Sequence, residues 1–254
     1  MDFQFHDIKG KHVFITGGGS GIGASLTEGF LAQGAKVSFV QRSDAEQFLN
    51  KMIAKYEITP LFIQCDLTNI DEVKNAMAQA QEQLGDIDVL VNNAGNDIRH
   101  SLESFSVEDW ENNHGVNLRP YFFTTQFVAP FMAKNAGGSI INYSSASYMM
   151  GLSGFPAYVA ANAAITGLTR AFARELGPDN IRVNAIVPGW VLTQKQLDKW
   201  ANPEDLKAHL DKQCLKEHLV PEDMIGGTLF LASNASKMMT GQVIVIDGGV
   251  VVTG

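Results

Sequence analysis

Tyr158 and Asn162 are separated by one helical turn, and they combine a residue that can transfer protons with an unexpected partner for it. A phenol has a pKa of about 10, so near neutral pH it is a poor base unless a nearby charge favours the phenolate. A residue at i+4 lies on the same helix face, where a lysine would supply that charge. Asn162 is neutral and shorter, so the tyrosine lacks the cation that would activate it.

A glycine-rich turn follows the first strand-like segment. Residues 16–23 read TGGGSGIG, after an apolar run at 12–16 and before a helical pattern at 24–33. Glycines permit a tight turn and a close approach to a pyrophosphate, whose charge the N-terminus of the next helix stabilises. A plain glycine turn is the alternative, which the flanking strand and helix disfavour. The residues expected to bind a dinucleotide are Gly17, Gly19, Ser20, Gly21, Ile22 and Gly23.

The loop after the second expected strand indicates which dinucleotide binds. It reads Gln41, Arg42, Ser43, with no acid before Asp44 to hold the ribose hydroxyls. The guanidinium of Arg42 suits a ribose 2′-phosphate. We therefore expect these three residues to contact the cofactor and NADP to be preferred over NAD, the alternative being a solvated surface arginine.

The bulk composition excludes several partners. The 254 residues are 45% hydrophobic and 18% charged, which is typical of a soluble globular protein. A formal net charge of −8 disfavours nucleic acid and anionic membranes. Cys65 and Cys214 are the only cysteines, residues 1–7 lack a signal-peptide pattern, and no apolar run could span a bilayer. We expect a cytoplasmic protein that binds neither nucleic acid nor membrane, and we assign no metal ligands.

Short apolar runs alternate with amphipathic segments along the whole chain. This alternation predicts parallel strands with right-handed crossover helices. Strands are expected at 12–16, 36–40, 61–64, 88–91, 139–143, 181–187 and 242–246. Helices are expected at 24–33, 44–55, 71–83, 107–134, 157–176 and 221–232, with Pro120 and Pro130 breaking or kinking the fourth. The predicted fold is α/β: a single Rossmann-like, doubly wound parallel sheet with helices on both faces. Residues 1–254 form one domain, in which the helical segment 190–220 covers the substrate.

Taken together, these motifs resemble the short-chain dehydrogenase/reductase family over essentially the whole chain. They occur in the family's order: 16–23, Asp66-Leu67, Asn92-Asn93-Ala94-Gly95, Val116-Asn117-Leu118, Ser144-Ser145, Tyr158 and Val187-Pro188-Gly189. The resemblance implies that Asp66 and Leu67 border the adenine. It assigns support of the sheet and of the adenosine ribose to Asn93, Ala94 and Gly95. It assigns the nicotinamide pocket to Pro188, Gly189, Val191 and Thr193.

The same resemblance implies the catalytic roles. Asn117 would hold a relay water, Ser145 would hydrogen-bond the reacting oxygen, and Tyr158 would move the proton. The family's lysine, which binds the nicotinamide ribose and lowers the tyrosine pKa, falls on Asn162. Without the resemblance, Asn117, Ser145 and Tyr158 would be interpreted as buried structural groups.

The asparagine predicts an impaired enzyme with an intact fold. General-base catalysis contributes roughly 10²–10⁴-fold, and each unit of tyrosine pKa is worth about 1.4 kcal/mol. Three explanations of Asn162 stay open: an engineered Lys→Asn change, a natural enzyme with altered chemistry, and a natural cofactor-binding protein without turnover.

The segments 92–100 and 116–119 resemble bacterial sugar (aldose) 1-dehydrogenases of the family, such as D-xylose 1-dehydrogenase, and 214–222 is similar to them too. These enzymes oxidise an aldose at C1 to the lactone. The expected sugar contacts are Asn96, Arg99, Ser147 and Trp190, although each could instead face solvent or an interface. The sequence does not identify the sugar, its anomer or the physiological direction.

Two other functions remain open: a carbonyl or 3-oxoacyl reductase on the same scaffold, and a dinucleotide-binding protein without catalysis. Family resemblance also implies a homotetramer. In it, helices within 106–134 and 157–176 pair across subunits, and residues 248–254 pack at a second interface.

Overall fold

A seven-stranded parallel sheet organises the protein. The computed structural model describes residues 4–252, so the expectations for residues 1–3 and 253–254 lie outside the described residues. The strand order is β3-β2-β1-β4-β5-β6-β7. The strands are β1 (His12–Thr16), β2 (Lys36–Gln41), β3 (Leu61–Gln64), β4 (Val89–Asn92), β5 (Gly138–Tyr143), β6 (Ile181–Pro188) and β7 (Val243–Ile246). The predicted doubly wound fold is confirmed.

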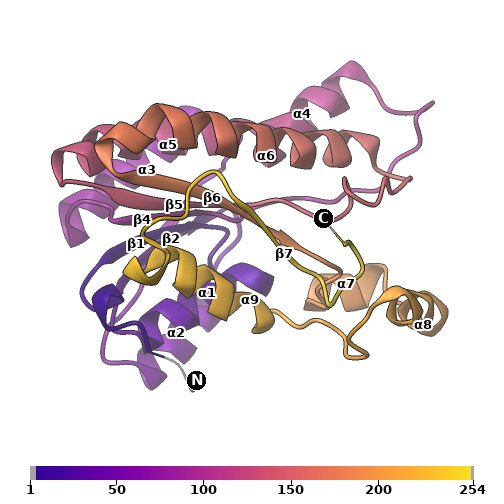
Figure 1. Cartoon of the computed structure of the whole chain (residues 1–254), viewed down its shortest axis with the longest axis horizontal. Coiled ribbons are helices and arrows are strands. Elements are labelled where there is room, and N and C mark those ends of the chain that lie inside the picture. Colours follow the sequence, from indigo (N-terminus) through magenta and orange to yellow (C-terminus); the bar gives the residue numbers. More distant parts are fainter. Residues whose placement is uncertain (1–3, 253–254) are drawn as a thin grey trace.

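Helices cover both faces of the sheet (Figure 1). One layer holds α1 (Gly21–Ala32), α2 (Glu46–Lys55) and α9 (Asp223–Ala232). The other holds α3 (Ile70–Leu84), α4 (Val107–Asn117), α5 (Arg119–Lys134) and α6 (Pro156–Leu176). Two short helices, α7 (Gln194–Lys199) and α8 (Pro203–Lys212), stand apart from both layers at one end of the molecule (Figure 1).

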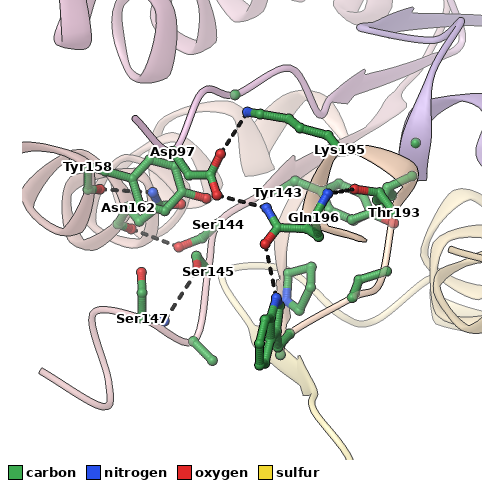
Figure 2. A pocket seen from close by; sticks show the side chains of 18 of the residues that line it. Asp97, Tyr143, Ser144, Ser145, Ser147, Tyr158, Asn162, Thr193, Lys195 and Gln196 are labelled. Carbon is green, nitrogen blue, oxygen red and sulfur yellow. Dashed lines mark hydrogen bonds and ion pairs between the residues drawn. The ribbon is translucent and has the colours of Figure 1, made fainter. Parts of the chain in front are cut away.

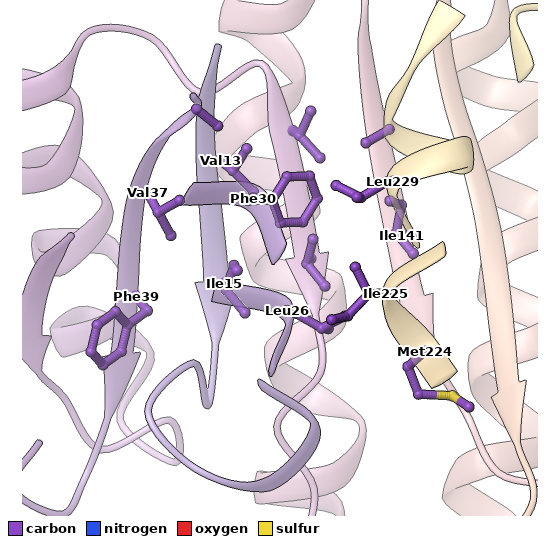
Figure 3. Close-up of a cluster of buried hydrophobic side chains, with 14 of the residues drawn as sticks. Val13, Ile15, Leu26, Phe30, Val37, Phe39, Ile141, Met224, Ile225 and Leu229 are labelled. Atoms are coloured by element: carbon purple, nitrogen blue, oxygen red, sulfur yellow. The ribbon is translucent and has the colours of Figure 1, made fainter. Parts of the chain in front are cut away.

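Alternate residues of the buried strands supply one hydrophobic core to each layer of helices. Val13 and Ile15 of β1 point toward α1 and α9, where they pack with Phe30 and Leu229 (Figure 3). Phe14, between them in sequence, belongs to the cluster that α3, α5 and α6 complete. Strands buried on both faces are continuous apolar runs, as β1 and β4 are. The two cores fix the ends of the central strands, where the loops of the site begin.

The prolines of the fourth expected helix behave differently from each other. The helix is interrupted at Leu118, and Pro120 lies in the first turn of α5, where the missing N–H costs nothing. Pro130 lies inside α5 without ending it, so of the expected break or kink there is no break at this position. It is exposed, and so is Gln126, whose carbonyl loses its i+4 donor on the water-facing side of the helix. Among residues 4–252, no helix combines the length and apolar character needed to cross a membrane.

Candidate active site

A cavity of about 780 Å³ opens at the carboxyl ends of the parallel strands. In this sheet β1 lies between β2 and β4, so consecutive crossovers run in opposite directions on its two sides. Such a switch point is where open α/β sheets bind ligands. Four strands send residues into the lining from the loops that follow them: 17–23 after β1, 93–97 after β4, 144–147 after β5 and 188–196 after β6.

The glycine turn has the shape that a pyrophosphate cradle needs. Gly17 has φ +71° and Gly21 has φ +52°, a backbone conformation that side chains disfavour. A Cβ on Gly21 would lie 3.2 Å from the Thr193 methyl, and one on Gly23 would overlap the carbonyl oxygen of Gly17. Helix α1 begins at Gly21 with its N-terminus at the cavity. These features fit the phosphates of a dinucleotide.

Five residues assigned to the adenosine end lie at the ends of β2 and β3: Gln41, Arg42, Ser43, Asp66 and Leu67. Gln41 accepts a hydrogen bond from the Gly19 N–H at 3.0 Å and donates to the Ser43 hydroxyl at 3.2 Å, so its amide ties this loop to the glycine turn. Asp66 accepts from Thr68, and these bonds, with a smaller contribution from Arg42, hold its pKa below the usual range. Arg42 is exposed beside this carboxylate. The adenosine contacts, Gly19 and Leu67 included, stay predictions.

The residues assigned to the nicotinamide pocket all line the cavity: Pro188, Gly189, Val191 and Thr193. Ala94 and Gly95, which were assigned to the sheet and the adenosine ribose, line it too. Ser20, Ile22 and Asn93 line it as well. The Asn93 amide donates to the Thr16 carbonyl at 3.0 Å, which ties the end of β4 to β1. The Thr193 hydroxyl caps α7 by accepting from the Gln196 N–H at 3.3 Å. Cofactor contact is predicted for all of these residues, and the structure brings them together in the lining of one cavity.

Tyr158 and Ser145 lie in the same cavity. Burial raises the pKa of Tyr158, and the Asp97 carboxylate raises it further, while hydrogen bonding by Ser145 and Asn162 opposes this shift. The Ser145 hydroxyl oxygen accepts from the Ser147 N–H at 3.2 Å, which orients the hydroxyl beside the phenol (Figure 2). The arrangement supplies a hydrogen-bond donor beside a phenol whose proton is held tightly.

Asn162 is 3% exposed and is engaged by its own helix. Its side-chain N–H donates to the Tyr158 carbonyl at 2.9 Å, and its backbone carbonyl accepts from the Ser144 hydroxyl at 2.8 Å (Figure 2). It therefore fits the fold, but it brings no positive charge to the phenol.

Asn117 holds a loop with both ends of its amide. Its oxygen accepts from the Asn96 N–H at 2.7 Å, and its nitrogen donates to the Asn96 carbonyl at 3.1 Å. It is the last residue of α4, just before the interruption at Leu118. The relay-water role predicted for it stays a prediction.

An ion pair that sequence reasoning missed crosses the mouth of the cavity. Lys195 of α7 lies 2.7 Å from Asp97, in the loop after β4 (Figure 2). Gln196 donates to the same carboxylate at 2.8 Å and accepts from the Trp190 indole at 2.9 Å. Burial alone would raise the pKa of Asp97, but the bonds from Lys195 and Gln196 outweigh burial and lower it. The polar composition of 194–217 was the only sequence signal, and it named no partner.

Three of the four predicted sugar contacts line the cavity: Arg99, Ser147 and Trp190. Asn96 is not among the lining residues; its side-chain oxygen accepts from Lys195 at 3.1 Å instead. The segment 190–220 contributes α7 and α8, whose residues form part of the lining. Trp200 and His209 of this segment also face the cavity, although sequence reasoning singled out neither.

Comparison with known proteins agrees with this geometry. A family model described as "Enoyl-(Acyl carrier protein) reductase" matches residues 17–251. The chain is 47% identical over 250 residues to "Probable galactose dehydrogenase GalD" of Rhizobium meliloti, covering 97% of each chain. It is 47% identical over 246 residues to D-xylose 1-dehydrogenase of Caulobacter vibrioides, covering 96% of this chain and 97% of that one.

A solved structure has the same fold. The blue fluorescent protein from a metagenomic library, in complex with NADPH, superposes with a TM-score of 0.88 at 31% identity, covering 97% of this chain and 100% of that one. The glycine turn, the serine–tyrosine pair and these matches have one explanation. The chain belongs to the short-chain dehydrogenase/reductase family of NAD(P)-dependent oxidoreductases.

Proposed function

We propose that the protein oxidises an aldose at C1 to the lactone, with NADP preferred over NAD as the hydride acceptor. The observation that carries this proposal is that Ser145 and Tyr158 share one cavity with the glycine turn at 17–23. Two relatives at 47% identity, described as galactose and D-xylose dehydrogenases, support a sugar as the substrate.

Ser145 and Tyr158 have different roles at the C1 hydroxyl group: Ser145 binds its oxygen and Tyr158 removes its proton. The Ser145 hydroxyl donates to the sugar oxygen and holds it beside the phenol. Tyr158, as the phenolate, removes the hydroxyl proton. A nicotinamide held by Pro188, Gly189, Val191 and Thr193 would supply the acceptor for the hydride of C1. Loss of that hydride and of the hydroxyl proton leaves the carbonyl of the lactone.

Asn162 limits the rate of this reaction. The pKa of Tyr158 is raised by burial and by Asp97, and Asn162 lowers it only through a neutral hydrogen bond. The phenolate is therefore scarce at neutral pH. We propose that the chain is a slowed sugar dehydrogenase in which Asn162 takes the place of the activating cation.

The test is nicotinamide reduction with NADP and with NAD against a panel of aldoses, by the given chain and by Asn162→Lys. Slow turnover by the given chain and faster turnover by the lysine variant support the proposal. Dinucleotide binding by both, without turnover of any aldose, would instead identify a cofactor-binding protein. Activity confined to carbonyl or 3-oxoacyl substrates would identify the reductase alternative.

We also propose that the chain assembles as a homotetramer. Large apolar side chains of α4 and α5 are exposed, among them Val107 at 79%, Trp110, Phe122 and Phe131. Exposed apolar groups on neighbouring helices are typical of a protein interface. Light scattering should give a mass near four times 27.6 kDa, and a monomeric mass would refute the assembly.

A further inference from the structure

Three buried polar atoms in the cavity lack any hydrogen-bond partner among residues 4–252. They are Oγ of Ser147, Nε1 of Trp200 and Nε2 of His209. Ser147 is only 5% exposed. Buried polar atoms without partners are rare because each loses its bonds to water without replacement. Because all three atoms belong to residues that line one cavity, they indicate a ligand that supplies the missing hydrogen bonds.

Trp200 is connected to Tyr158 by a row of neighbouring aromatic rings and one guanidinium group. The Tyr158 ring lies 5.5 Å from the Phe155 ring. The Arg99 guanidinium lies 3.8 Å from the Phe155 ring and 5.4 Å from the Trp200 ring. This row links Trp200 to Tyr158 through Arg99 and Phe155, and all four residues line the cavity.

His209 is connected to the site by a second row. Its ring meets the Trp190 ring edge to face at 5.4 Å, and Trp190 donates to Gln196, which holds Asp97. Burial, helped by the nearby charges of His218 and Lys212, lowers the pKa of His209. Its imidazole is therefore neutral at neutral pH, and Nε2 can donate or accept according to the tautomer.

The hydrogen-bonding capacity of these three atoms indicates which class of ligand binds in the cavity. An indole offers one donor, and a serine hydroxyl or a neutral imidazole can donate or accept. Their aromatic rings supply apolar faces around these polar edges. A neutral polyol matches this set, because each of its hydroxyls donates and accepts while its C–H faces pack on rings. Of the cations in the lining, Lys195 is paired with Asp97 and Arg99 lies against the Phe155 and Trp200 rings, which leaves Lys212 at the end of α8.

We propose that Trp200 and His209 form a subsite that hydrogen-bonds the sugar hydroxyls remote from C1, with Ser147 completing the set beside Ser145. This inference rests on the proposed aldose oxidation, and it makes α7 and α8 the elements that select among sugars. Because the three unpartnered atoms belong to neutral groups, the ligand class is a neutral monosaccharide rather than a sugar acid.

The test compares Trp200→Phe and His209→Phe with the parent enzyme, in both the given chain and the Asn162→Lys background. Each change keeps an aromatic ring and removes the polar atom. The matched control is Thr125→Val, because Oγ1 of Thr125 is also buried without a partner among the described residues but lies in α5, away from the cavity lining.

Values of kcat/KM are measured for D-galactose, D-xylose and monodeoxy analogues of the better substrate. We expect each aromatic variant to lose about 10-fold on the parent sugar, mainly through KM, and to lose nothing on one deoxy analogue. Thr125→Val should match the parent enzyme on every sugar. An equal loss on all sugars would overturn the subsite.

Saturation-transfer NMR separates failure of this inference from failure of the proposed function. If no variant oxidises any aldose, the proposed function fails, while binding of D-galactose or D-xylose that Trp200→Phe abolishes still supports the subsite. Absence of sugar binding, or stronger binding of D-gluconate than of D-galactose, would refute the subsite as described.

Discussion

Replacing Asn162 by lysine tests the central feature of the site. Asn162 is buried at the cavity wall, one turn after Tyr158, and its amide hydrogen-bonds the Tyr158 carbonyl and the phenol. A lysine at this position gives up these side-chain hydrogen bonds and reaches further along the same face. We therefore expect Asn162→Lys to fold and to place an ammonium group near the phenol.

The size of the effect follows from Coulomb attraction. A cation about 5 Å from a phenolate, at an effective dielectric constant of about 20, attracts it by roughly 3 kcal/mol. This lowers the tyrosine pKa by about 2 units. While the phenolate is scarce, the rate follows its fraction, so kcat/KM at pH 7 should rise roughly 100-fold, within the range of general-base catalysis.

The assay is the pH profile of kcat/KM for aldose oxidation. Tyr158 must lose its proton to act, so the rate rises with pH until its pKa is reached. Because that pKa lies above the ordinary 10.0 in the given chain, its profile should still be rising at pH 10. The profile of Asn162→Lys should level off at a pH about 2 units lower.

Asn162→Met is the matched control, since methionine has nearly the length of lysine without its charge. It should keep the profile of the given chain. The electrostatic explanation is refuted if the methionine variant gains as much as the lysine variant, or if lysine leaves the profile in place.

Two further predictions concern charges around the cavity. Lys195→Met removes the partner of Asp97, so the carboxylate acts on Tyr158 without compensation, the tyrosine pKa rises further, and the oxidation profile shifts to higher pH; an unchanged profile would mean that the ion pair serves only to hold α7. Arg42→Ala should weaken NADP about 10-fold and leave NAD nearly unaffected, as measured by the two KM values. Equal losses for both dinucleotides would show that Arg42 does not contact the 2′-phosphate.

Local sequence patterns were sufficient for the architecture and for one end of the site. Strand periodicity, the glycine turn and the order of the family motifs predicted the doubly wound sheet and the cluster around Tyr158, and the structure places Ser145 and the glycine turn in one cavity with it. The sheet and the position of these residues could be predicted from short stretches of chain, because the alternation of strands and helices implies a parallel sheet whose carboxyl ends lie at one edge. Pro130 does not break α5, because exposure of the helix face decides whether a proline is tolerated there.

The substrate side of the site was decided by tertiary structure. Asp97 and Lys195 are 98 positions apart, and nothing in either neighbourhood identifies the other as its partner. Trp200 and His209 line the cavity because the fold brings α7 and α8 to it, which their local sequence does not indicate. The sequence by itself determined a dinucleotide-binding α/β domain with a tyrosine lacking its cation, since these are encoded by local periodicity and adjacent residues. The packing of distant loops at the ends of the strands determined which polar groups face the substrate, because that depends on the closure of the whole sheet.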